Sequence, residues 1–119
     1  MRLRSLYWVK YHLNYLRIWR DSVEKVAKAV KDLEPLAEVY VVGGVAEGRL
    51  TVLSDVDVVI VVYRDLNASD VNMLRRSVYV RAVDLYGLPW DYPIDIHIMN
   101  RDEFTRVFIK RGKKVLRIT

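Results

Sequence analysis

The chain has 119 residues, of which 52% are hydrophobic and 29% are charged, so it is long enough for one globular domain with its own core. It contains no cysteine, which excludes disulfides, zinc–thiolate sites and cysteine nucleophiles. The formal net charge of +5 suits a nucleic acid or an acidic protein as partner, and equally serves solubility. The sequence holds no apolar run long enough to span a membrane and no recognisable signal peptide, so we expect a cytoplasmic location.

The first predicted element is helical and covers residues 5–33. Residues 1–20 form an aromatic N-terminal helix in this interpretation, with one face that carries Trp8, Tyr11, Tyr15 and Trp19. This face either covers the domain's own sheet or meets a partner chain, a second copy included, since Tyr and Trp favour interfaces. Asp21 opens a pattern similar to a capping box, which allows a new helix to start there, and Pro35 ends the helical segment.

The rest of the chain alternates between strand and helix patterns. Runs of β-branched residues predict strands at 38–42, 55–63 and 94–99. Between the last two, a helix follows Ser69 as N-cap and ends at Gly87; its apolar side carries Val71, Leu74, Val78, Ala82 and Leu85. A short helix at 101–108 and a basic tail at 109–119 complete the chain. The order predicts a single two-layer α/β domain with three strands backed by helices.

Two aspartates open the second predicted strand. Because side chains alternate along a strand, Asp55 and Asp57 point to the same face, with Cα atoms about 6.5–7 Å apart. A third carboxylate, Asp95, lies in the apolar third strand. If the two strands are neighbours, the three carboxylates repel one another unless divalent cations lie between them. Two ions about 3.5–4 Å apart are the usual arrangement where nucleotidyl groups are transferred.

Each of these features also has a structural interpretation. A single aspartate at a strand end is usually a cap, but two spaced by two residues, with a third on another strand, are harder to explain that way. Gly43 and Gly44 allow a backbone to approach a phosphate closely. His97 shares a face with Asp95 and either borders the site or is a half-buried strand histidine, and Ser54 caps the turn into the second strand.

The combination Gly43-Gly44, Gly48, Ser54-Asp55-Val56-Asp57 and Asp95 resembles the nucleotidyltransferase superfamily of DNA polymerase beta type. More narrowly, it is similar to the minimal nucleotidyltransferases of prokaryotes, many of them archaeal, over about residues 21–100. The absence of glutamine among many charged residues favours a thermophilic source.

The resemblance implies a nucleotidyltransferase fold with a three-stranded mixed sheet. It also implies two Mg²⁺ ions bound by Asp55, Asp57 and Asp95, and ATP held by Gly43, Gly44 and Ser54. Asp95 would be the base, or would position the base, for the attacking hydroxyl.

Two positions depart from the family pattern. Gly44 replaces a serine that contacts phosphate, and Glu47 replaces an arginine near the triphosphate. Backbone N–H groups can serve at the first position. At the second, Arg49 lies two residues along the chain and is the candidate for a compensating cation.

The resemblance implies transfer of AMP from ATP to a hydroxyl of a partner protein, in an antitoxin-like role beside a helical HEPN-type toxin. An alternative is a catalytically weakened module that binds a nucleotide or a partner and acts by contact, which Gly44 and Glu47 favour. A third is nucleotidyl transfer to RNA, which the positive charge favours.

Overall fold

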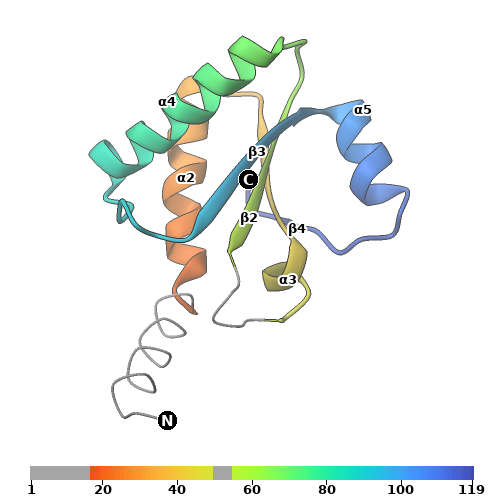
Figure 1. The fold of residues 1–119 in the computed structure, drawn as a ribbon, viewed down its shortest axis with the longest axis horizontal. Coiled ribbons are helices and arrows are strands. Elements are labelled where there is room, and N and C mark those ends of the chain that lie inside the picture. The colour runs from red at the N-terminus through yellow and green to blue at the C-terminus, as the bar shows by residue number, and fades with distance from the viewer. Residues whose placement is uncertain (1–16, 50–54) are drawn as a thin grey trace.

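The computed structural model of the protein describes residues 17–49 and 55–119, and Figure 1 shows its fold. The helices are α2 (Trp19–Leu33), α3 (Gly43–Ala46), α4 (Ala68–Tyr86) and α5 (Arg101–Phe104), followed by a π-helical turn, η1 (Thr105–Ile109). The strands are β1 (Glu38–Val42), β2 (Val56–Val62), β3 (Ile94–Asn100) and β4 (Leu116–Arg117). The predicted α/β architecture is confirmed.

The strands form one mixed sheet in the order β3-β2-β1-β4. β1 runs antiparallel to both β2 and β4, whereas β2 and β3 are parallel and are joined by the long crossover helix α4. The sequence predicts three strands and a basic tail, and the structure adds β4 within that tail. Two residues are too few to show a strand period, so β4 is recognisable only from its pairing with β1.

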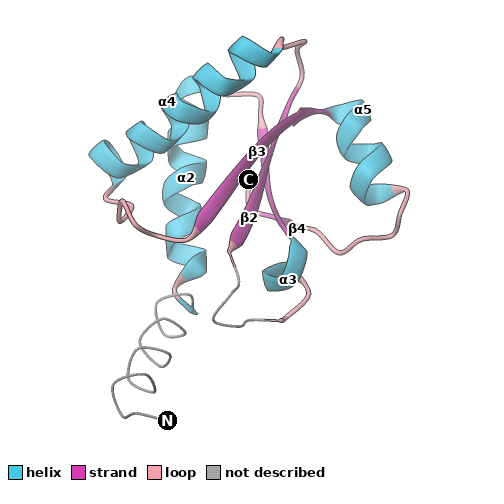
Figure 2. Cartoon of the chain, in the orientation of Figure 1, coloured by secondary structure: helices cyan, strands magenta, loops and turns pink. Residues whose placement is uncertain are grey.

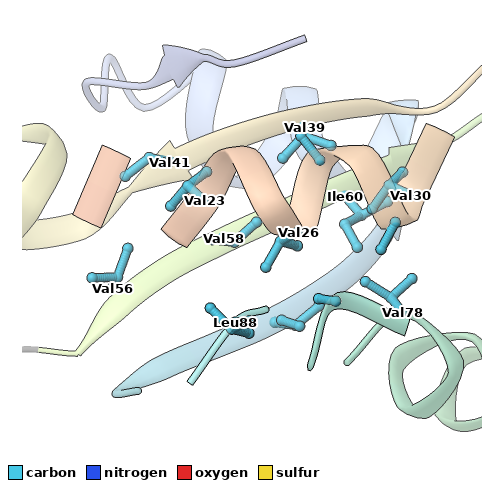
Figure 3. Packing of buried hydrophobic residues seen from close by; sticks show 14 of the residues in the cluster. Val23, Val26, Val30, Val39, Val41, Val56, Val58, Ile60, Val78 and Leu88 are labelled. Atoms are coloured by element: carbon cyan, nitrogen blue, oxygen red, sulfur yellow. The ribbon is translucent and has the colours of Figure 1, made fainter. Parts of the chain in front are cut away.

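One face of the sheet is covered by α2 and α4, as Figures 1 and 2 show. The stripe Val23, Val26 and Val30 of α2 is fully buried, and in Figure 3 it packs over the strands that carry Val39, Val41 and Val58. β-branched side chains favour strands and pack closely there, which explains the valine-rich core. Burying such side chains is the main stabilising contribution on this face.

The opposite face is only partly covered. Tyr40, Val42, Val59 and Val61 form a second cluster with Phe104 of α5, whose ring lies 4.5 Å from that of Tyr40. α5 lies on the other side of the sheet from α2 and α4 (Figure 1). Along β2 the same face continues from Val61 and Val59 to Asp57, because side chains alternate. The end of this face that carries Asp57 is not covered by any helix that the structure describes, and it forms part of the cleft described below.

Some element boundaries differ from those predicted. α2 begins at Trp19 rather than at Asp21, whose carboxylate lies 2.9 Å from Lys25 one turn along the helix. α4 begins one residue after Asn67, whose side chain accepts the N–H of Asp70 at 2.8 Å, so Asn67 and not Ser69 is the N-cap. Leu85, expected on the buried side, is 61% exposed.

Most of the predicted aromatic N-terminal helix, residues 1–16, lies outside the described residues. Trp19, the last aromatic residue of its predicted face, is partly buried against the core cluster of the domain itself. In the described segments, 17–49 and 55–119, no helix is both long enough and apolar enough to cross a bilayer.

Candidate functional site

The register of the sheet brings two of the predicted acids together. Asp57 of β2 lies directly opposite Asp95 of β3, and on its other side Asp57 is paired with Val42 at the end of β1. Directly opposed residues in neighbouring strands have their side chains on the same face, here the open one. Two carboxylates thus stand side by side on adjacent strands, partly exposed, with 36% of the Asp57 side chain and 57% of the Asp95 side chain accessible.

His97 completes this group. Its Nε2 lies 3.3 Å from Oδ2 of Asp95 and 3.6 Å from Oδ1 of Asp57. One ligand atom from each of the three side chains fits within 4.8 Å of the others. Of the two interpretations that the sequence left open for His97, the structure favours the first, because the imidazole lies between the two carboxylates.

The three side chains lie in a cleft of about 450 Å³. Gly43 and Glu47 from the α3 region line it, as do Glu103 and Phe108 from the helices after β3 and Lys113 and Lys114 from the segment before β4. The cleft is large enough for a small organic ligand. Its acidic groups come from the strands and helices, while both of its lysines come from the C-terminal segment.

Gly43 sits against Asp57 and is required there for two reasons. Its φ of +73° lies in the left-handed region, which side chains other than glycine rarely adopt. A Cβ atom added to Gly43 would also lie 2.7 Å from Oδ2 of Asp57. The glycine turn therefore leaves the space that the Asp57 carboxylate occupies.

The charge of Asp57 is disfavoured in the protein alone. Burial raises the pKa of its carboxyl, and the nearby carboxylates of Asp95 and Asp55 raise it further, while the His97 imidazole opposes the shift. Removal of water and like charges both penalise an ionised carboxylate. A cation bound between the acids would relieve this penalty.

The donor set fits a divalent cation. Mg²⁺ takes oxygen ligands and commonly binds through one or two carboxylates together with substrate phosphates, which Asp57 and Asp95 at the edge of an open cleft can provide. An imidazole beside them also suits Mn²⁺ and other transition metals.

The remaining predicted site residues are placed differently. Asp55 is exposed just before β2 and lies outside the group formed by Asp57, Asp95 and His97, although its charge acts on Asp57. Arg49 is 70% exposed and forms an ion pair with Glu47 at 2.8 Å. Ser54 lies outside the described residues.

Gly44 occupies the first turn of α3. A Cβ atom there would lie 3.2 Å from the carbonyl oxygen of Arg49, a tight contact, and the N–H of Arg49 donates to the Gly44 carbonyl at 2.7 Å. This close backbone approach gives a local reason for glycine at the position where the family pattern has serine.

The cleft contains residues that the sequence interpretation did not assign to the site: Glu103, Lys113 and Lys114. The two lysines belong to the segment interpreted as a basic tail. The sequence offered a weak signal, the apolar pair Val115 and Leu116 three and four residues after Gly112, which is consistent with a short strand returning to the sheet.

The sequence profile of the nucleotidyltransferase domain family matches residues 23–115, which is most of the chain. Comparison with curated proteins and with solved structures gives no match. The matched range includes the glycine turn, the three aspartates, His97 and both lysines of the cleft. The chain therefore belongs to the nucleotidyltransferase domain family.

Proposed function

We propose that the protein is a metal-dependent nucleotidyltransferase that transfers AMP from ATP to a hydroxyl group of a partner protein. The observation that carries this proposal is the direct pairing of Asp57 with Asp95 in the sheet, with His97 between their carboxylates. Such a group at the open end of a cleft is suited to phosphates and divalent cations together.

In the proposed reaction, the acceptor oxygen forms a bond to the α-phosphorus of ATP. The bond between the α-phosphorus and the bridging oxygen breaks, and pyrophosphate leaves. Asp95 accepts the hydroxyl proton, and Nε2 of His97, 3.3 Å from Oδ2 of Asp95, is within reach to share it. Mg²⁺ held by Asp57 and Asp95 would neutralise charge on the phosphates.

The position of Asp95 supports a separate approach for the acceptor. Asp95 borders the main cleft and also a second groove of about 410 Å³ between α4 and the edge strand β3. This groove is lined by Asn72, Arg75, Arg76 and Tyr79 of α4. Arg75 is fixed there because its Nε donates to the Ile96 carbonyl at 2.9 Å. An acceptor segment in this groove could present its hydroxyl to Asp95 while ATP occupies the main cleft.

By the family resemblance, the acceptor is a tyrosine on a helical HEPN-type toxin, and the protein acts as the antitoxin of the pair. The experiment combines purified protein with Mg²⁺, ATP labelled at the α-phosphorus and the protein encoded by the neighbouring gene. We expect label on the partner, and none with Asp57→Asn, Asp95→Asn or a metal chelator. Absence of label on the partner with the wild-type protein would contradict the proposal.

A second candidate is a binding module that acts by contact alone. The observation that favours it is Glu47, whose carboxylate lines the cleft where the family pattern has an arginine. ATP with Mg²⁺ should raise the melting temperature of an ATP-binding enzyme, because a ligand that binds only the native state stabilises it by mass action. No rise at saturating nucleotide would favour the contact module. Label recovered in added RNA would instead favour nucleotidyl transfer to RNA.

A further inference from the structure

The main cleft is rich in negative charge. Asp57, Asp95, Glu47 and Glu103 all line it, and each ordinarily carries a negative charge at neutral pH. A nucleoside triphosphate is also strongly anionic, so bound metal ions alone leave much repulsion to overcome. Arg49 does not enter the lining of the cleft and is paired with Glu47 at 2.8 Å. A positive group has to reach the phosphates from another part of the chain.

Lys113 and Lys114 are the lysines that line the cleft. Both are exposed, and neither ammonium group forms an ion pair with another residue in the described part of the chain. They are therefore available to a ligand. Lys is a common phosphate-binding residue, acting as a mobile point charge on a long stem.

The backbone that carries these lysines is fixed on both sides. Before them, the N–H of Gly112 donates to the Ile109 carbonyl and the N–H of Lys113 donates to the Phe108 carbonyl, each at 3.0 Å. After them, Val115 packs on the second core cluster and β4 pairs with β1. Gly112 makes the turn with a φ of +66°. This anchoring holds the two Cα atoms beside the cleft and leaves the side chains free to adapt.

We propose that Lys113 and Lys114 bind the phosphates of the nucleoside triphosphate. They would supply the positive charge that an arginine provides in the family pattern, where this chain has Glu47. This inference rests on the proposed function, because it requires a triphosphate in the cleft. It assigns a role in substrate binding to the segment between η1 and β4, and it makes β4 the element that holds this segment in place.

The test measures binding of ATP, ADP and AMP by calorimetry in the presence of Mg²⁺. The variants are Lys113→Gln, Lys114→Gln and the double variant, which remove the charge and leave a polar side chain that is one atom shorter. Lys110→Gln is the matched control, because Lys110 belongs to the same basic segment but does not line the cleft. Each cleft substitution should weaken ATP binding about tenfold, the loss of one charge-assisted contact.

The pattern across ligands distinguishes phosphate contacts from general effects. We expect the double variant to lose most affinity for ATP, less for ADP and little for AMP, with an unchanged melting temperature without ligand. Double substitution by arginine should retain ATP binding, since the charge is kept. Equal losses for all three nucleotides, or an equal loss with Lys110→Gln, would overturn the inference.

The two proposals fail differently. If the wild type and the double glutamine variant bind ATP with equal affinity, the role of the lysines is overturned and the nucleotidyltransferase proposal stays intact. Wild-type protein that binds no ATP overturns both. Because binding is measured without an acceptor, the result does not depend on the identity of the partner.

Discussion

The carboxylate of Asp57 lies where its charge is costly in the absence of a cation. It is partly buried and lies beside Asp95 of the neighbouring strand. Its pKa is raised mainly by burial and further by its acidic neighbours. A charged residue placed this way lowers the stability of the domain, a cost that binding of a cation would offset. Binding and catalytic sites commonly show this opposition between stability and function.

The first prediction concerns Asp57→Asn, which keeps the shape of the side chain and removes its charge. A carboxyl with a raised pKa makes the native state less stable as the pH rises from 3.8 through the folded value, and the full penalty applies above it. At pH 8 without metal, the variant should therefore be more stable than the wild type by about 0.5–1 kcal/mol, since solvent screens part of the repulsion.

Urea unfolding across a pH series measures this difference. It should shrink towards zero as the pH falls below 3.8, where both proteins are uncharged at this position. Addition of Mg²⁺ and ATP should reverse the order, because under the proposed function only the wild type would bind them tightly. A variant that is less stable than the wild type at pH 8 without metal would contradict this account of Asp57.

The second prediction compares Gly43→Ala with Gly87→Ala. Both glycines have a φ near +74°, so either substitution should cost about 1–2 kcal/mol in unfolding free energy. A Cβ at Gly87 meets nothing within 4 Å, whereas a Cβ at Gly43 meets the Asp57 carboxylate. Only Gly43→Ala should therefore weaken ATP binding, as measured by calorimetry with Mg²⁺. Equal ATP affinity in the two variants would show that Gly43 does not position Asp57.

At the scale of secondary structure elements, Glu38 joins several parts of the sheet. Its carboxylate accepts hydrogen bonds from the hydroxyls of Tyr40 at 2.7 Å and Tyr63 at 2.8 Å. Arg101 of α5 and Arg117 of β4 approach it at 3.3 Å and 3.5 Å. One side chain at the start of β1 thus connects β1, the end of β2, α5 and β4. Of these elements, α5 covers part of the second face of the sheet, and β4 anchors the C-terminal segment to β1.

The third prediction is that Glu38→Gln lowers stability by about 1.5–3 kcal/mol at pH 7, the typical net value of a hydrogen bond to a charged group. The Tyr40 hydroxyl, followed by that of Tyr63 and the two arginines, lowers the pKa of Glu38 despite its burial. This contribution is present above pH 4.5 and is lost as the pH falls through the folded value. The gap between wild type and variant, measured by thermal unfolding, should therefore close in acid.

Glu24→Gln, a substitution at an exposed position of α2, serves as the control and should change stability by less than about 0.5 kcal/mol. A gap between wild type and Glu38→Gln that is constant from neutral to acid pH would contradict an ionic role for Glu38.

The elements that the sequence predicted well are those with a long regular pattern. The valine runs of β1 and β2 and the apolar stripes of α2 and α4 match the buried residues of the core, with Leu85 of α4 as an exception. β4 was missed because two paired residues carry no period, and its position depends on β1, more than seventy residues earlier in the chain. The N-cap at Asn67 was misassigned because asparagine and serine both cap helices well, so the local sequence does not choose between them.

For the molecule as a whole, the predicted site depended on whether β2 and β3 are neighbours in the sheet. The spacing of Asp55 and Asp57 indicates a shared face, but only the adjacency and register of β2 and β3 bring Asp95 to it. His97 follows from the same register, since it lies two residues beyond Asp95. The lysines of the cleft were not predictable from local patterns, because β4 and the backbone contacts after η1 bring them there.

The whole fold also explains why one end of the sheet is free for chemistry. α2 and α4 bury most of one face, while α5 and η1 cover only the part of the other face around Val59 and Val61. The open end combines the acids of two strands with the glycine turn after β1 and the lysines before β4. Four distant segments of the chain therefore contribute to one cleft.

The most direct test is a crystal of the protein with Mn²⁺ and a non-hydrolysable ATP analogue, examined by anomalous diffraction at the manganese edge. We predict a manganese peak within bonding distance of both the Asp57 and Asp95 carboxylates, with the triphosphate in the same cleft. A well-ordered nucleotide whose metal touches neither carboxylate, or manganese bound elsewhere with the cleft free of nucleotide, would contradict the account.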